Sequence, residues 1–226
     1  MMRILTLPLV LMPLAAPLPA AAQDQIDLPD GCTAYLTVQS KSCRVSHHFT
    51  CEMDPDGWQR RIDMDQNGIS YLGAIDDETR WMESFHMYSG HSERLVEGAE
   101  NPASFTELLE SGVNTYEFET DSDEVGVSRY VGEDRLTGET VDIDGVTLDR
   151  TQYAITAYDA DGNVTWSSTG TEYINRDWRM FLSGQSTYMS DGESFDSDDA
   201  PVEFIFPDEA GFLSPNPKFG CNEESA

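Results

Sequence analysis

The sequence predicts an all-β protein in which an antiparallel meander forms a strongly curved sheet or flattened barrel with one short helix. Two observations carry this prediction. Asx-Gly dipeptides, which favour tight hairpin turns, recur at residues 30–31, 56–57, 67–68, 144–145, 161–162 and 191–192. Between these turns hydrophobic and polar residues alternate with a period of two, as a half-buried strand requires. Short connections between many strands are typical of an antiparallel meander.

The first 22 residues are predicted to be a cleavable secretory signal. Arg3 precedes an apolar run at residues 4–12, and small residues end at Ala20-Ala21-Ala22. The run is short and interrupted by proline, and no later segment is apolar enough to cross a bilayer. We therefore expect a mature form without a transmembrane segment, located in the periplasm or secreted. Residues 23–226 are predicted to form a single antiparallel β domain.

Four cysteines, an even number in an exported chain, predict two disulfides with three possible pairings. A hairpin turning through residues 40–42 places Val38 opposite Val45, Ala34 opposite Phe49 and Cys32 opposite Cys51. Directly opposed residues are close enough to bridge. The ends of a continuous strand from Cys43 to Cys51 are about 26 Å apart, beyond disulfide reach. The predicted pairs are therefore Cys32–Cys51 and Cys43–Cys221.

The alternation of polar and apolar residues defines the other elements. In residues 115–119, Tyr116 and Phe118 alternate with threonine and glutamate. The predicted strands cover residues 33–39, 43–51, 58–65, 69–72, 81–88, 115–119, 125–131, 141–143, 146–148, 154–158, 164–166, 171–174, 178–182 and 202–206. The acidic stretches 117–124 and 191–199 are interpreted as solvated edges or loops.

One segment has a helical pattern. Asn101 is expected to cap a helix that begins at Pro102, and Gly112 lies just past its end. The apolar residues Phe105, Leu108 and Leu109 fall on one stripe, so this helix is expected to pack on the sheet.

The charge balance excludes some partners. With 42 Asp and Glu against 13 Lys and Arg, the formal charge is −29. A field of this sign repels nucleic acid and anionic membranes and attracts cations or basic proteins. We interpret the acidity first as a means of solubility.

No catalytic residue is predicted. The chain has neither HExxH nor CxxC, and no phosphate-binding glycine loop. The segment 184–188 lacks the second glycine of a nucleophile elbow. His47 and His48 are neighbours on a strand and point to opposite faces, with His47 expected in the core. His86 and His91 match no familiar zinc spacing.

Calcium is the only cofactor with any support in the sequence. Asp63, Asp65 and Asn67 match the start of an EF-hand loop, but its twelfth position is Ala74 where the motif has glutamate. A second oxygen-rich turn contains Asp159 and Asp161. The preference of Asp and Asn for turns explains both segments equally well.

A hairpin near residue 177 is a weak candidate for ligand binding. Arg176, Trp178 and Arg179 combine cations with an aromatic ring, a combination that can recognise a carboxylate or stack on a ring. The alternative is that Trp178 belongs to a buried strand face and that both arginines pair with local acids.

The hairpin run from residues 138–145 through residues 178–181 resembles secreted bacterial all-β proteins of unknown function. It is also distantly similar to the curved open sheets of periplasmic lipoprotein-carrier domains. The resemblance rests on the meander and on export, covers at most the second half of the chain and carries over no site residue. Those carriers use more helices than the one predicted here.

The expected function is that of a non-enzymatic periplasmic or secreted binding protein. A curved sheet with an apolar concave face suits a small lipophilic ligand, and an acidic exterior suits a basic protein partner. The alternative is a structural or envelope-associated protein stabilised by disulfides and calcium. A third class is an enzyme of unrecognised type, although no nucleophile–base pair or metal cluster emerges.

Overall fold

The computed structural model describes residues 25–221, so the predicted signal at residues 1–22 lies outside the described part. The chain forms one antiparallel sheet and one helix. The strands of the first half are β1 (Cys32–Ser40), β2 (Arg44–Cys51), β3 (Gln59–Asp65), β4 (Gly68–Ile75), β5 (Trp81–His86), β6 (His91–Leu95) and β7 (Val113–Asp121). The remaining elements are α1 (Phe105–Ser111), β8 (Ser128–Ile143), β9 (Val146–Tyr158), β10 (Val164–Asn175), β11 (Met180–Ser190), β12 (Glu193–Asp198) and β13 (Pro201–Ile205).

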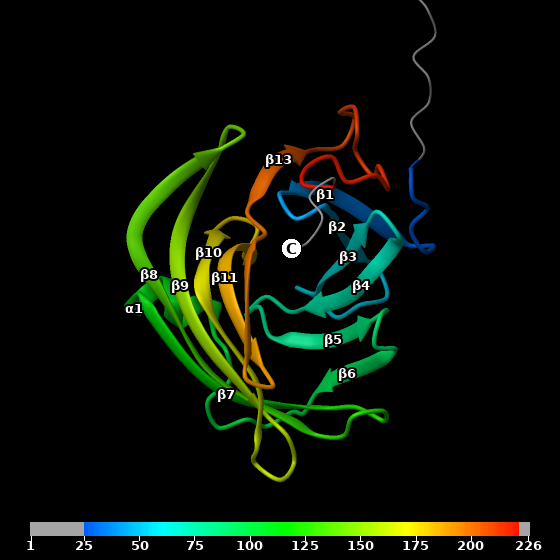
Figure 1. The fold of residues 1–226 in the computed structure, drawn as a ribbon. Coiled ribbons are helices and arrows are strands. Elements are labelled where there is room, and N and C mark those ends of the chain that lie inside the picture. Colours follow the sequence, from blue (N-terminus) through cyan, green and yellow to red (C-terminus); the bar gives the residue numbers. More distant parts are fainter. Residues whose placement is uncertain (1–24, 222–226) are drawn as a thin grey trace, which may run out of the picture.

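The sheet has 13 strands, and twelve of them follow one another in space as they do in sequence. Only β13 departs from this order, because it pairs with β1 and forms one edge, while β12 forms the other. The sheet curls around a central space and stays open, so the prediction of a strongly curved sheet is confirmed and closure into a barrel is not seen (Figure 1).

The two edges of the sheet meet at one corner. Residues 199–200 link β12 to β13, and two ion pairs join this corner to the β1–β2 hairpin. Lys41 lies 2.9 Å from Asp198, and Arg44 lies 2.5 Å from Asp199. These contacts bring the last third of the chain back to its beginning.

The strand β7 presents one face to the inside of the curl and one to solvent. In β7, Tyr116, Phe118 and Thr120 are buried, while Glu117 and Glu119 are exposed. This alternation is the one predicted from the sequence, because a period of two places every second side chain on the same face. The buried face of β7 carries Tyr116 and Phe118, whose aromatic rings line the cavity inside the curl.

Both predicted disulfides, Cys32–Cys51 and Cys43–Cys221, are confirmed. The register of the first hairpin needs a correction. Cys32 lies opposite Cys51 as predicted, but Val38 lies opposite Ser46 and not Val45, because a bulge between Ala34 and Leu36 shifts the pairing by one residue. The turn accordingly spans residues 41–43.

The helix begins later than predicted. Ser104 is its N-cap, with a side-chain oxygen that accepts a hydrogen bond from the Glu107 backbone N–H, so Asn101 and Pro102 lie outside the helix. Asn101 instead forms a bridge to Glu117 of β7. The predicted end is confirmed, since Gly112 adopts a left-handed conformation there with φ 81°.

Several strand boundaries also differ from the prediction. β6 and β12 were not predicted; both are short, and every residue of β12 before Asp198 is exposed. The predicted strands 164–166 and 171–174 are one strand, β10. Trp178 lies in the turn before β11 and not within the strand. Among residues 25–221 no helix is long and apolar enough to cross a membrane.

Candidate binding cavity

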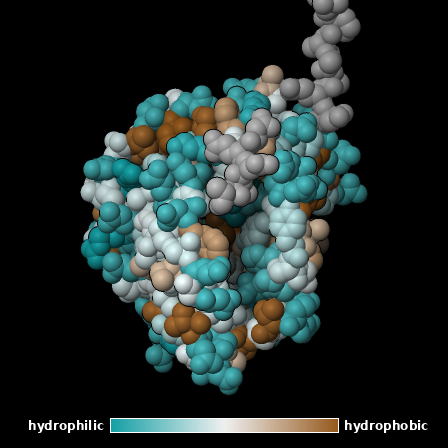
Figure 2. Space-filling model, viewed as in Figure 1, coloured by the Kyte–Doolittle hydropathy of each residue, from teal (hydrophilic) through white to brown (hydrophobic). Residues whose placement is uncertain are grey.

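The inside of the curl holds two adjoining spaces, which we call the inner and outer chambers. The inner chamber has a volume of about 320 Å³ and the outer chamber about 870 Å³, and they share lining residues that include Trp81, Trp166 and Glu172. Pockets for small molecules fall in this size range. The space-filling view shows the molecule hollowed near the centre, with hydrophobic residues visible inside (Figure 2).

Aromatic rings dominate the inner chamber. They come from five strands, β5, β7, β9, β10 and β11: Trp81, Tyr116, Phe118, Tyr153, Trp166, Phe181 and Tyr188. The rings contact one another mostly edge to face or tilted. Trp81 meets Phe118 at 5.5 Å between centroids, and Trp166 meets Tyr188 at 5.5 Å. Such packing fixes the ring faces that line the chamber.

Two acidic side chains share this aromatic chamber. Asp134 of β8 is 9% exposed, and Glu172 of β10 is partly buried. Burial raises the pKa of Asp134 to about 7, and the neighbouring charge of Glu133 adds to the effect. Burial likewise raises the pKa of Glu172 to about 8; the charge of Asp134 adds to this shift and that of Arg61 opposes it. Among the described residues neither carboxylate forms an ion pair or a side-chain hydrogen bond.

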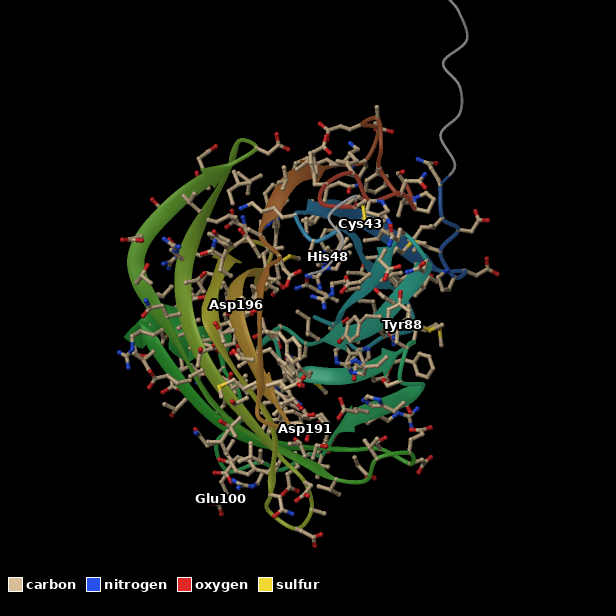
Figure 3. All side chains as sticks on the ribbon, viewed as in Figure 1. Cys43, His48, Tyr88, Glu100, Asp191 and Asp196 are labelled. Atoms are coloured by element: carbon tan, nitrogen blue, oxygen red, sulfur yellow. A yellow bond between two sulfur atoms is a disulfide. The ribbon has the colours of Figure 1, made fainter. Side chains whose placement is uncertain are left out.

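The other charges near Glu172 are already matched. Arg61 of β3 lies 3.0 Å from Asp63, and its guanidinium stacks over the Tyr71 ring at 4.9 Å from the centroid. His48 lines a small adjoining pocket with Arg61 and Asp63, and burial lowers its pKa to about 3, so it is neutral. Figure 3 shows His48 inside the curl and Glu100 on its outside. Because Arg61 pairs with Asp63, Asp134 and Glu172 have no cationic side chain paired with them among the described residues.

Local backbone features position the chamber walls. Gly132 of β8 lies opposite Tyr116 of β7, and a Cβ atom at Gly132 would stand 2.5 Å from the Tyr116 ring. The absence of a side chain therefore lets this ring lie against the neighbouring strand.

The helix packs against strands that also line the inner chamber. Phe105 and Leu108 of α1 pack with Ile174, and Leu136 packs against this group. Leu136 and Ile174 follow Asp134 and Glu172 by two residues on their strands, so they lie on the same faces as the two acids.

A second group of polar side chains lines the outer chamber. His86, His91 and Glu93 come from the β5–β6 hairpin, and one potential ligand atom from each lies within 4.8 Å of the others. Among residues 25–221 this is the one group of three or more His, Cys, Asp or Glu residues that meets this criterion.

The structure places Arg176, Trp178 and Arg179 outside both chambers, in the β10–β11 turn. Arg176 lies 2.5 Å from Asp149, and Arg179 lies 2.8 Å from Glu78. Trp178 packs against apolar residues of β13. The two arginine pairs agree with the alternative interpretation, whereas Trp178 lies in a turn and not on a buried strand face. A ligand at this turn stays a prediction.

The structure does not bring the calcium candidates together in one group. Asp63 pairs with Arg61 inside the curl. Asp65 accepts hydrogen bonds from the backbone N–H of Asn67 and the Tyr88 hydroxyl. In the other turn, Asp159 accepts backbone hydrogen bonds from Asp161 and Asn163. The oxygens therefore have the turn-stabilising roles that Asp and Asn often play.

Sequence reasoning missed Asp134, Glu172 and the histidine–glutamate group. Glu172 carries a detectable signal, because it lies within a predicted strand. Asp134 lies in a part of β8 that was not predicted as a strand. His86 and Glu93 become neighbours only through the pairing of β5 with β6, and β6 was not predicted.

Comparison of this chain with protein-family models, with curated proteins and with solved structures found no match.

Proposed function

We propose that this chain is an exported binding protein whose inner chamber takes a small organic cation with an apolar body. The observation that carries the proposal is the pair of unmatched carboxylates, Asp134 and Glu172, set among aromatic rings. The two disulfides support an oxidising location, periplasmic or extracellular.

The apolar body follows from the shape and lining of the chambers. A volume of about 320 Å³ opening into about 870 Å³ accommodates a short alkyl chain or a ring system. Walls of tryptophan, tyrosine and phenylalanine favour apolar contact, because burial of apolar surface is the main driving force for such binding.

The positive charge follows from electrostatics. Burial of an ionised carboxylate in an apolar site raises its free energy, so both acids hold protons near neutral pH. A bound ammonium group restores the ionised form by direct attraction, and the faces of Trp81 and Trp166 attract the same charge. An anionic ligand gains neither interaction. The ligand charge is therefore opposite in sign to the acids.

Three ligands with the same ten-carbon chain test this proposal. We expect decyltrimethylammonium to bind more tightly than decanol, and decanoate most weakly, measured by titration calorimetry on the chain without its signal. The preference for the cation grows as the pH rises through about 7 to 8, because both carboxylates lose their protons in that window.

The double variant Asp134→Asn, Glu172→Gln removes both charges at nearly constant volume. It is expected to abolish the preference for the cation over decanol while decanol still binds. Glu119→Gln, on the exposed face of β7, is the matched control and keeps the preference. Equal affinity of the parent for the cation and decanol would contradict the proposal. No binding of any of the three ligands would favour a structural role.

A further inference from the structure

We propose that His86, His91 and Glu93 form a binding site for one divalent transition-metal ion of the zinc class, in the wall of the outer chamber. This site is separate from the two acids of the inner chamber, and it does not depend on the ligand proposed above. The argument rests on the geometry of one hairpin and on the groups that hold it.

The β5–β6 hairpin brings the three side chains to one face. His86 pairs directly with His91, and Ser84 pairs with Glu93, so all four side chains project to the same side. The imidazole Nε2 of His86 lies 3.6 Å from a carboxylate oxygen of Glu93. In four-coordinate zinc, bonds of about 2.0–2.2 Å place neighbouring ligand atoms roughly 3.3–3.5 Å apart. His86 and Glu93 are therefore close to the spacing of two metal ligands, and side-chain rotation has to bring a nitrogen of His91 to the same ion.

A second set of side chains orients these ligands. One carboxylate oxygen of Glu93 accepts hydrogen bonds from the Tyr130 hydroxyl at 2.9 Å and the Thr120 hydroxyl at 3.1 Å. The other oxygen is left facing His86. Residues that bind metals are typically held in this way by partners behind them.

The histidines are oriented as well. Nδ1 of His91 lies 2.7 Å from the Ser89 hydroxyl, which leaves Nε2 as its ligand atom. The two imidazole rings stack with 4.5 Å between centroids, so one ring has to turn out of the stack before both histidines can bind the same ion. Ser84 lies 3.4 Å from both His86 and Glu93 and keeps these two groups together.

The ligand set indicates the class of metal. Two imidazoles with one carboxylate suit zinc, nickel or copper, whereas calcium and magnesium require mainly oxygen ligands. All three residues line the outer chamber, so a fourth coordination position faces its interior. The negative charge of the chain, −29, favours any cation that approaches.

Calorimetric titration of the metal-stripped chain with Zn²⁺ tests this site, using protein without a histidine tag. We expect one equivalent to bind, and His91→Ala to weaken binding by more than about 100-fold. Tyr130→Phe removes only the hydroxyl behind Glu93 and is expected to weaken binding roughly tenfold. Glu100→Gln, at an exposed position on the outside of the curl, is the matched control with unchanged affinity (Figure 3).

A measurement on the parent chain keeps the test independent of how the variants fold. Zn²⁺ is expected to shift the imidazole NMR signals of His86 and His91 and to leave those of buried His47 and His48 in place. Binding of Ca²⁺ with equal affinity, retention of one tight zinc equivalent in a folded His91→Ala variant, or zinc binding without shifts of His86 and His91 would each overturn the proposal.

Discussion

Asp134 and Glu172 show at the scale of single residues how acids that line a cavity lower the stability of the fold at neutral pH. Each carboxyl loses hydration in the inner chamber without gaining a cationic partner among the described residues. Because their pKa values in the folded chain lie above those of the unfolded chain, folding takes up protons. The contribution of these acids to stability is therefore largest at low pH and decreases as the pH rises towards 8.

The first prediction concerns this pH dependence. The free energy of unfolding of the parent is expected to fall by on the order of 1–2 kcal/mol from about pH 7 to about pH 8.5, because both acids must ionise where burial disfavours their charge. The Asp134→Asn, Glu172→Gln variant is expected to show a much flatter profile by urea unfolding. A parent profile that is already flat would contradict the raised pKa values.

The histidines act at the acidic end of the range. Burial lowers the pKa of His47 to about 4 and that of His48 to about 3, so both are neutral in the folded chain. Their contribution to stability is complete above the unfolded value of about 6.5 and is lost as the pH falls below it. The window above pH 6.5 therefore isolates the effect of the two acids.

At the scale of elements, the β7–β8 pair shows how a strand makes room for a ring. Tyr116 is 8% exposed and occupies the surface that a side chain at Gly132 would cover. Glycine within a strand is usually unfavourable, since it adds no packing of its own. Here the cost of the glycine is offset because Gly132 allows the Tyr116 ring to lie against β8 and line the inner chamber.

The second prediction follows from that contact. Gly132→Ala is expected to destabilise the fold by roughly 1–3 kcal/mol, because the new methyl group overlaps the Tyr116 ring. The same change in a Tyr116→Ala background is expected to cost much less, which a double-mutant cycle by urea unfolding can measure. Equal costs in both backgrounds would show that the ring is not the obstacle.

The sequence correctly predicts those strands, turns and helix ends that depend on the local pattern of residues. Alternation in β7 and the Asx-Gly turn between β8 and β9 predicted strands and hairpins correctly, and Gly112 predicted the end of the helix. The strand β12 was not predicted because almost all of its side chains are exposed. Without an apolar face, its sequence lacks the alternation of polar and apolar residues that indicates a strand. Hydrogen bonding to β11 alone defines it.

The candidate sites depend on register, which a local pattern does not contain. A single bulge near Tyr35 was enough to shift one hairpin from its predicted pairing. Asp134 and Glu172 lie on different strands separated by β9, and their proximity to the same aromatic rings arises from the curvature of the sheet. Such curvature is a property of many strands acting together.

At the scale of the whole molecule, two disulfides act over very different lengths of chain. Cys32–Cys51 joins residues 19 apart, whereas Cys43–Cys221 joins residues 178 apart. The longer link holds the C-terminal segment against the first hairpin, where the Lys218 backbone N–H also donates a hydrogen bond to Gln39.

The third prediction compares these links. Replacing Cys43 and Cys221 by serine is expected to lower the free energy of unfolding by about 5 kcal/mol, against about 3 kcal/mol for Cys32 and Cys51, since a longer loop leaves more entropy to the unfolded chain. Urea unfolding of the two double variants measures the difference. A larger loss from the shorter link would contradict this entropic account.

The strand order also sets a sequence of events during synthesis. Every pairing but one joins strands that are neighbours in the chain, so the meander can assemble from local hairpins as it emerges. The pairing of β1 with β13 has to wait for the end of the chain. Cys43 must therefore remain a free thiol while Cys221 is still being made, with Cys51 only a few residues away. Closure of Cys32–Cys51 before Cys221 arrives would remove that wrong partner and keep Cys43 available for its late one.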